Sequence, residues 1–160
     1  PIECAQTISQ PFTVAFMTQI LEVQPGDKIL EIGTGSGYQA AILSKLGAEV
    51  YSVERIEKLH ENAKALLAEL GYKVFLKLDD GTLGWEEFAP YNKIIVTAGA
   101  PDIPHHLIVQ LTENGKLIIP VGDQESQRLL MITASKDGFE KKFYDHFKFV
   151  PLIGEDGWKA

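Results

Sequence analysis

The chain has 160 residues, of which 45% are hydrophobic and 23% charged, and its formal net charge is −7. This length suits one domain with a sizeable core. No Lys/Arg run exceeds two residues, so a nucleic acid is not expected as a partner, and no membrane partner is expected either. No apolar run approaches the roughly 18 residues of a membrane span. The four histidines are scattered along the sequence, which argues against a metal site. We expect no signal peptide, and the single Cys4 indicates a reducing, cytoplasmic compartment.

The first predicted helix follows a loop at the start of the chain. Residues 1–10 show no hydrophobic period, whereas Pro11 suits the first turn of a helix, with Ser9 or Gln10 in the cap region. We expect this helix to run to about Glu22. Its apolar face at helical spacing consists of Val14, Met17 and Leu21.

The stretch 28–38, KILEIGTGSGY, predicts a buried strand, a glycine turn and a helix that extends to Leu46. A dinucleotide-binding fingerprint would place its third glycine at position 38, but Tyr38 stands there and would crowd a pyrophosphate. The spacing E-x-G-x-G-x-G is instead similar to motif I of the S-adenosylmethionine-dependent methyltransferases. Glycine-rich turns also join strands to helices in unrelated α/β proteins, so this motif alone leaves both interpretations open.

Alternating strand and helix patterns continue along the chain. We expect strands at 49–54, 74–78, 93–97 and 116–120, helices at 56–70 and 104–111, and a loop at 79–90 with a possible helical turn. Residues 129–134 and 139–149 then form a hairpin around a polar turn at 136–138. The predicted buried side of the 56–70 helix consists of Leu59, Ala63, Leu66 and Leu70. The pattern indicates an α/β fold with a mostly parallel sheet, a C-terminal antiparallel hairpin and a single domain over residues 1–160.

Carboxylates follow two of the predicted strands. Glu54 ends the strand at 49–54, where a carboxylate can accept hydrogen bonds from ribose hydroxyls, and we favour this role over a solvated charge at a strand end. Asp79 and Asp80 follow the next strand, where one could accept from an adenine amine, form an acid–base pair or only cap a turn. We favour Asp80 at the nucleoside. Thr7, Ser9 and Gln10, taken alone, are most simply helix caps.

Seven motifs together carry a resemblance that extends over nearly the whole chain. They are QTISQP at 6–11, LEIGTGSGYQAA at 30–41, VERI at 53–56, DGTLGW at 80–85, IIVTAGAP at 94–101, GKLIIPVG at 115–122 and FVPLIGEDGW at 149–158. In this order they closely resemble the protein-L-isoaspartate O-methyltransferases, and QTISQP is far more specific than the glycine motif. The resemblance implies a Rossmann-like methyltransferase fold with a seven-stranded sheet and helices on both faces.

The resemblance also implies a reaction and a set of residues. The cofactor would be S-adenosyl-L-methionine, leaving S-adenosyl-L-homocysteine, and the methyl acceptor the α-carboxyl of L-isoaspartyl residues in damaged proteins. The ester would close to a succinimide that reopens partly to aspartate. Ser9 matches the active-site serine, and substrate would be bound by Thr7, Ile8, Ser9 and Gln10. Cofactor-binding positions would be Glu31, Gly33, Thr34, Gly35, Ser36, Gly37, Glu54, Arg55, Asp80, Gly81 and Thr97.

The chemistry fits so few reactive side chains, because a carboxylate acceptor is already ionised at neutral pH and needs no strong base. We therefore expect Ser9 to position the acceptor and not to act as a nucleophile. The chain begins five residues before Gln6, whereas the family usually has further N-terminal residues, including a helix, and Asp79, Ala5 and Glu3 replace glycine or glycine-like positions.

Other functions stay open on the sequence alone. The alternatives are another carboxyl methyltransferase on the same scaffold, a cofactor-binding module without catalysis, and a nicotinamide-dependent dehydrogenase, against which Tyr38 argues. We expect a monomer whose partners are damaged proteins and peptides.

Overall fold

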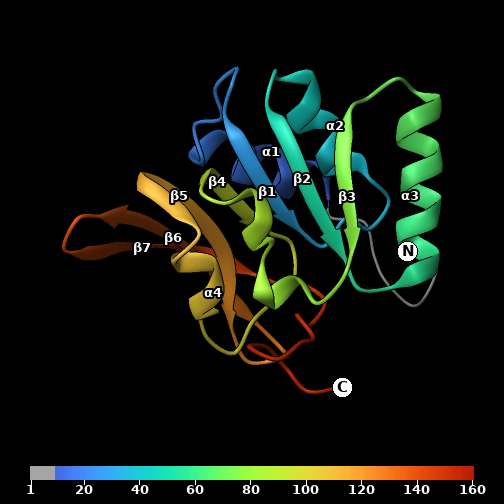
Figure 1. Ribbon diagram of the computed structural model, residues 1–160. Coiled ribbons are helices and arrows are strands. Elements are labelled where there is room, and N and C mark those ends of the chain that lie inside the picture. Colours follow the sequence, from blue (N-terminus) through green and yellow to red (C-terminus); the bar gives the residue numbers. More distant parts are fainter. Residues whose placement is uncertain (1–9) are drawn as a thin grey trace.

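Seven strands pair into one mixed sheet in the computed structural model, which describes residues 10–160 (Figure 1). Of the predicted substrate loop, Thr7, Ile8 and Ser9 lie outside the described residues. The strand order across the sheet is β3-β2-β1-β4-β5-β6-β7. The strands are β1 (Lys28–Ile32), β2 (Glu49–Glu54), β3 (Val74–Leu78), β4 (Tyr91–Val96), β5 (Leu111–Gly122), β6 (Gln127–Ser135) and β7 (Gly138–Phe147).

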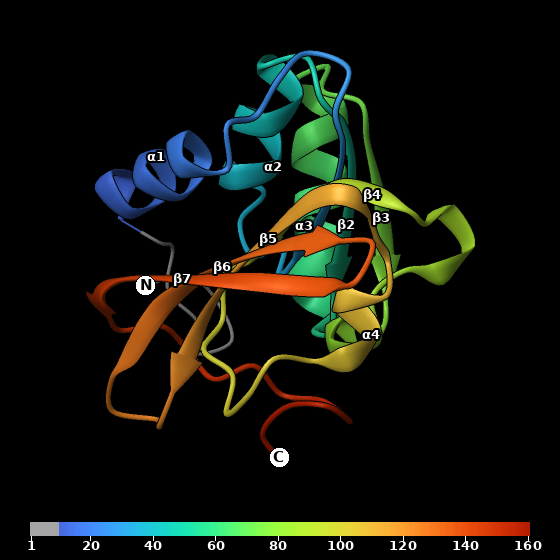
Figure 2. The ribbon, with the colours of Figure 1, turned by 90° about the vertical axis from the view of Figure 1, so that its left-hand side faces the viewer.

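The first five strands are parallel and the last two reverse direction. Strand β1 lies between β2 and β4 and pairs parallel with both, while β3 pairs with β2 and β5 with β4 in the same sense. Strands β5, β6 and β7 form an antiparallel meander, which faces the viewer in Figure 2. The predicted mostly parallel sheet with a C-terminal hairpin is thus confirmed.

Helices cover both faces of the sheet because each inward-facing row of strand side chains is apolar. Helices α1 (Pro11–Ile20), α2 (Tyr38–Lys45) and α3 (Glu57–Glu69) contribute Met17, Leu43 and Leu67 to one core, which packs on Ile29, Val50 and Ile95 of the sheet. The opposite core contains Leu107 of the short helix α4 (His105–Ile108) and Trp85, which precedes the second of two 3₁₀ turns, Gly81–Leu83 and Glu86–Phe88. These turns occupy the predicted loop.

The predicted buried face of α3 is partly wrong. Leu59 and Ala63 are buried as expected, but Leu66 is 44% and Leu70 59% exposed, and Leu67 takes their place in the core. Leu59, Ala63 and Leu67 are spaced by four residues each, so they form one narrow stripe along the helix. Because α3 contacts β3, the edge strand, and β2, little sheet surface is available to bury a wider face.

Strand β5 is longer than the sequence pattern indicates, and two helices are shorter. The segment 112–115, which separates the predicted helix at 104–111 from the predicted strand at 116–120, lies inside β5, where Asn114 has a φ of +64°. Between its pairs with Tyr91 and Lys93, β5 advances from Leu111 to Lys116, so the turn-like residues form an irregularity in the strand. Helix α1 ends at Ile20 instead of Glu22, and α4 has only four residues.

Across residues 10–160, no helix is both long and apolar enough to cross a membrane. Within the same part of the chain, no group of three or more His, Cys, Asp or Glu side chains is arranged to hold a metal ion.

Candidate active site

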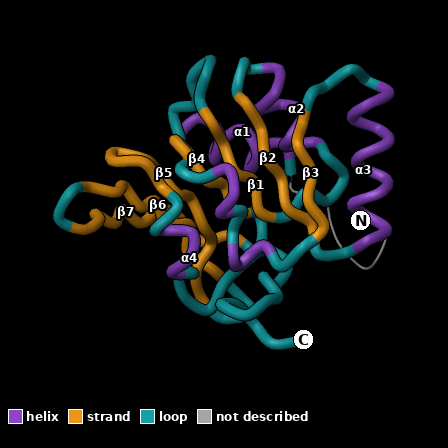
Figure 3. Tube along the Cα trace, in the orientation of Figure 1, coloured by secondary structure: helices purple, strands orange, loops and turns teal. Residues whose placement is uncertain are grey.

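A pocket opens where β1, β2 and β4 end. The loops that follow these strands lie at the same end of the sheet (Figure 3). Ligands of open α/β sheets bind at this edge, outside the carboxyl ends of the strands. The lining residues come from the glycine loop, the ends of β2 and β4, helices α1 to α3 and a C-terminal segment: Val14, Ile32–Ser36, Tyr38, Gln39, Val53–Ile56, Leu59, Gly81, Thr97, Ala98 and Val150–Ile153.

The glycine loop lies tightly against the end of β4, and this requires a glycine at position 33. Gly33 has a φ of +95°, and a Cβ there would lie 2.9 Å from Oγ1 of Thr97. The Thr97 hydroxyl donates to the carbonyl oxygens of Ile32 and Gly33, at 3.2 and 3.1 Å. The Gly33 N–H donates to the Val53 carbonyl at 2.9 Å. The loop is therefore held from both neighbouring strands.

The Glu54 carboxylate joins the glycine loop to the start of α3. Its Oε1 accepts from the Gly35 N–H and its Oε2 from the Ile56 N–H, each at 2.9 Å. The side chain is only 6% exposed but lines the pocket. Each carboxylate oxygen has a second lone pair, so both can still accept from hydroxyls of a ligand.

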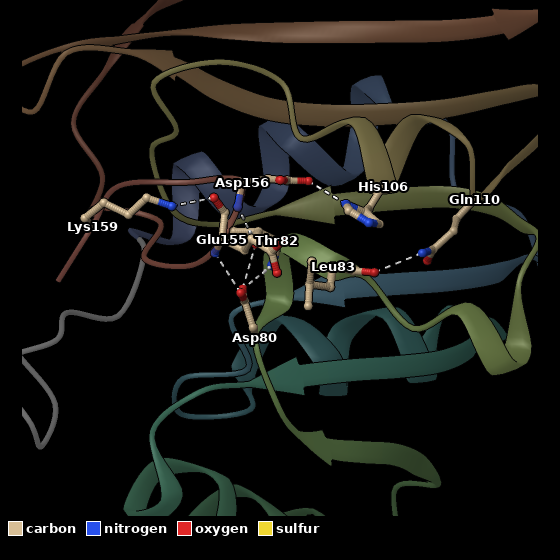
Figure 4. A network of polar contacts seen from close by, with 8 residues as sticks. All are labelled: Asp80, Thr82, Leu83, His106, Gln110, Glu155, Asp156 and Lys159. Atoms are coloured by element: carbon tan, nitrogen blue, oxygen red, sulfur yellow. Dashed lines mark hydrogen bonds and ion pairs between the residues drawn. The ribbon is translucent and has the colours of Figure 1, made fainter.

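The two residues predicted on the adenine side have different positions. Gly81 lines the pocket, and a Cβ there would collide with Cγ2 of Ile32. The Asp80 carboxylate is not among the lining groups. Its Oδ1 accepts from the Thr82 N–H at 2.9 Å and the Thr82 hydroxyl at 2.7 Å, and its Oδ2 accepts from the Glu155 N–H at 2.7 Å (Figure 4). Asp80 therefore caps the first 3₁₀ turn and fastens the C-terminal segment.

Some of the other predicted cofactor-binding residues line the pocket and some do not. Thr34, Gly35, Ser36, Arg55 and Thr97 line the pocket together with Gly33 and Glu54. Glu31 and Gly37 are not lining residues: Glu31 is fully buried, and Gly37 precedes α2 with a φ of +88°. Gln10, the described member of the predicted substrate loop, is exposed just before α1 and makes no side-chain cap. Val14, one turn later, reaches the pocket.

Sequence reasoning missed the wall formed by residues 150–153. The Gly99 N–H donates to the Val150 carbonyl at 2.7 Å, and the Leu152 N–H donates back to the Gly99 carbonyl at 2.9 Å. The indole N–H of Trp158 reaches the same Gly99 oxygen at 3.1 Å. The segment has neither a helical nor a strand period, so the only available signal was the motif FVPLIGEDGW itself.

An ion pair and a hydrogen bond hold the end of the chain over α4. Nδ1 of His106 lies 2.5 Å from Oδ2 of Asp156, and this contact raises the pKa of His106 (Figure 4). The Thr82 hydroxyl also accepts from the Asp156 N–H at 3.1 Å. The pocket wall is thus attached both to the turn after β3 and to α4.

The arrangement can bind an adenosine-like group without a phosphate. Apolar side chains on α3 and the C-terminal segment provide a slot, Glu54 provides a hydroxyl acceptor, and Tyr38 occupies the position at which a dinucleotide site needs glycine. The residues therefore fit a nucleoside sulfonium better than a dinucleotide.

Comparison with known proteins decides the family. The model of the protein-L-isoaspartate(D-aspartate) O-methyltransferase family matches residues 1–157. The chain belongs to this family. Members named protein-L-isoaspartate O-methyltransferase are 53% identical in Chlorobium limicola and 55% identical in Dictyoglomus thermophilum, in each case over 99% of this chain. The chain spans 74% and 73% of these two relatives.

Solved structures of the family have the same fold. A protein-L-isoaspartate O-methyltransferase structure matches 94% of this chain and 49% of its own with a TM-score of 0.88 at 31% identity. A structure described as this enzyme from Plasmodium falciparum, in complex with S-adenosyl-L-homocysteine, matches 96% of this chain and 78% of its own with a TM-score of 0.85 at 27% identity. The resemblance drawn from the motifs is confirmed.

Proposed function

We propose that this chain is a repair methyltransferase that moves a methyl group from S-adenosyl-L-methionine to the α-carboxyl of L-isoaspartyl residues in damaged proteins. The observation that carries the proposal is the pocket at the carboxyl ends of β1, β2 and β4 in a chain of this family. Its glycine loop and Glu54 are joined by a hydrogen bond, so the loop and the carboxylate that would bind the nucleoside form one unit.

The cofactor-binding residues that we propose are those of the predicted set that line the pocket. They are Gly33, Thr34, Gly35, Ser36, Glu54, Arg55, Gly81 and Thr97. Glu54 would accept from the ribose hydroxyls, and Gly81, where a Cβ would collide with Ile32, lets the backbone after β3 lie close against the pocket. For Asp80 we now propose an anchoring role, because three donors already occupy its carboxylate.

In this proposal the residues of the chain bind the cofactor, orient the acceptor carboxylate and exclude water. None of them has to remove a proton from the acceptor. The sulfonium supplies both the methyl group and the leaving group. An isoaspartyl α-carboxylate is ionised at neutral pH, so positioning it is the main task of the protein. The apolar lining formed by Val14, Ile56 and residues 150–153 would keep water from this region.

We assign Ser9 to the acceptor. In this proposal its hydroxyl donates to the carboxylate and fixes its direction, as the motif QTISQP implies by resemblance. Thr7, Ile8 and Gln10 would bind the neighbouring backbone of the damaged protein.

We further propose a cytoplasmic monomer. The reducing compartment is supported by the single Cys4 among the 160 residues. Light scattering of the purified chain at the assay concentration tests the oligomeric state, and a dimer mass would contradict it.

A paired-peptide assay tests the proposed reaction. Two peptides of one sequence, one with L-isoaspartate and one with L-aspartate, are incubated with the chain and methyl-labelled S-adenosyl-L-methionine. We expect base-labile label in the isoaspartyl peptide alone, because the ester is hydrolysed in alkali. Equal labelling of both peptides would indicate a different carboxyl methyltransferase, and binding of S-adenosyl-L-homocysteine without labelling would indicate a cofactor-binding module.

A further inference from the structure

A buried carboxyl group lies directly beneath the glycine loop and has no place in the mechanism above. Glu31 precedes Ile32 in β1 and is fully buried. Its register partners are Ser52 in β2 and Ile95 in β4. Because strand residues alternate between faces, Glu31 shares the face of Ile29, against which the α1–α3 side packs.

One of its oxygens begins a chain of hydrogen bonds that ends at the pocket. The Ser52 hydroxyl donates to Oε1 of Glu31 at 2.6 Å, and the Ser52 and Thr34 hydroxyl oxygens are also 2.6 Å apart. Ser52 is fully buried and Thr34 is 3% exposed, and Thr34 lines the pocket. Three side chains from β1, β2 and the glycine loop are thereby connected.

The other oxygen of Glu31 is unusual. Oε2 is buried and has no hydrogen-bond partner among residues 10–160. Burial raises the pKa of Glu31 to about 8, the Ser52 hydrogen bond opposes this shift, and the Glu54 charge adds to it. The protonated form of the group therefore predominates at pH 7. With its proton on Oε2, it keeps the lone pairs of Oε1 for Ser52.

The chain has a direction, because a serine hydroxyl carries one hydrogen. Ser52 gives that hydrogen to Glu31, so the bond between Ser52 and Thr34 must use the hydrogen of Thr34. Thr34 then points its hydrogen at Ser52, away from the pocket, and keeps both lone pairs of its hydroxyl oxygen for donors. If Glu31 did not accept from Ser52, the Ser52 hydroxyl could donate to Thr34, and the Thr34 hydrogen could turn toward the ligand.

We propose that Glu31 is a positioning residue that acts on the cofactor pocket through Ser52 and Thr34. It orients the Thr34 hydroxyl as an acceptor and holds the glycine loop in register with β2. The inference rests on the proposed function, since it takes the ligand of this pocket to be the methyl-donor cofactor.

Isothermal titration with S-adenosyl-L-homocysteine, together with thermal unfolding of each variant, tests the proposal. Glu31→Met removes the acceptor at similar volume, and Ser52→Ala removes the middle hydroxyl with a smaller change in packing. We expect each to weaken binding about fivefold to tenfold, the range for one hydrogen bond. Glu31→Gln keeps an acceptor for Ser52, so this variant should bind nearly as tightly as the unmodified chain.

The control for a general loss of stability is Ile118→Val, which changes a buried residue away from the pocket. It should lower the unfolding midpoint without weakening binding.

The decisive result is the double variant. If Glu31 acts through Ser52, Glu31→Met with Ser52→Ala binds no more weakly than Ser52→Ala alone. Losses that multiply, or a Glu31→Gln variant that binds as weakly as Glu31→Met, would overturn the inference. Should Glu31→Met not fold, Ser52→Ala and Glu31→Gln carry the test: Ser52→Ala then weakens binding and Glu31→Gln does not, and the opposite pattern overturns the inference. Failure of the unmodified chain to bind S-adenosyl-L-homocysteine would instead overturn the proposed function, and this inference with it.

Discussion

Glu54 shows how one side chain can serve both structure and ligand. Its carboxylate accepts from the N–H groups of Gly35 in the glycine loop and Ile56 just before α3. A ligand that donates hydroxyls to the same carboxylate would therefore be positioned relative to both the glycine loop and the start of α3.

Glu54→Gln should weaken S-adenosyl-L-homocysteine binding at least tenfold, because an amide nitrogen must replace an oxygen that accepts from backbone. Isothermal titration measures the effect. The control is Glu57→Gln, an exposed residue at the start of α3, which should bind like the unmodified chain. Unchanged affinity in Glu54→Gln would contradict the assigned role.

Ser9→Ala should lower turnover about tenfold to a hundredfold and leave S-adenosyl-L-homocysteine affinity within about twofold, because Ser9 is assigned to the acceptor and not to the cofactor. Steady-state methylation of the isoaspartyl peptide and titration of the cofactor product give the two values. An equal loss of turnover and affinity would argue against this assignment.

Glu31 also predicts a dependence of stability on pH. The pKa of its carboxyl group is about 8 in the folded chain, against an ordinary value of 4.5. Between these values the unfolded chain has lost a proton that the folded chain retains, so the contribution of this group to the free energy of unfolding falls as pH rises. Glu31→Gln lacks this titration, and its stability relative to the unmodified chain should increase from pH 5 to pH 8. Urea unfolding at both pH values checks this, and a constant difference would refute it.

At the scale of elements, the C-terminal segment is the part of the site that depends most on distant contacts. Residues 150–153 line the pocket, whereas 154–158 are fastened to Asp80, Thr82 and His106 (Figure 4). Loss of these hydrogen bonds or of the ion pair should make the pocket wall less ordered, although no lining residue is changed.

Asp80→Ala removes three accepted hydrogen bonds and should lower stability by about 2 kcal/mol. Thermal unfolding should show this loss together with weaker S-adenosyl-L-homocysteine binding. Asp79→Ala, next to it, removes an exposed pair with Lys77 and one exposed hydrogen bond accepted from the Asp80 N–H, and it should change both values less than Asp80→Ala does. If Asp80→Ala weakens binding without lowering stability, Asp80 contacts the ligand instead of anchoring the segment.

Gly154→Ala gives an independent check on the anchoring role. A Cβ at position 154 would collide with Oδ1 of Asp80 and lie 2.7 Å from Cγ2 of Thr82, although Gly154 does not line the pocket. We expect lower stability and weaker binding, as in Asp80→Ala. A Gly154→Ala variant with unchanged affinity would show that the wall does not depend on this contact.

A feature could be predicted from the sequence where neighbouring residues determine it, and not where contacts with distant segments determine it. The glycine loop could be predicted because positive φ at Gly33, Gly35 and Gly37 leaves a signature in three residues. The exposure of Leu66 could not, because it depends on the edge position of β3 rather than on the helix sequence. The role of Asp80 likewise depends on Glu155, which lies 75 residues away in the chain.

At the scale of the whole molecule, the strand order brings the site together. Strand β1 lies between β2 and β4, so the loops after all three end beside one another, and the returning C-terminus closes the same edge. The alternation of strands and helices predicted this sheet and the position of the glycine loop and Glu54. It did not predict Val14, Leu59 or residues 150–153 in the pocket, because packing between distant segments places them there.

A crystal structure of the chain with bound S-adenosyl-L-homocysteine tests the central claim most directly. The account predicts the nucleoside between the glycine loop and the C-terminal wall, its ribose hydroxyls within hydrogen-bond distance of Glu54, and the Ser9 hydroxyl on the side of the sulfur. A cofactor bound elsewhere, or a ribose that does not reach Glu54, would contradict the account.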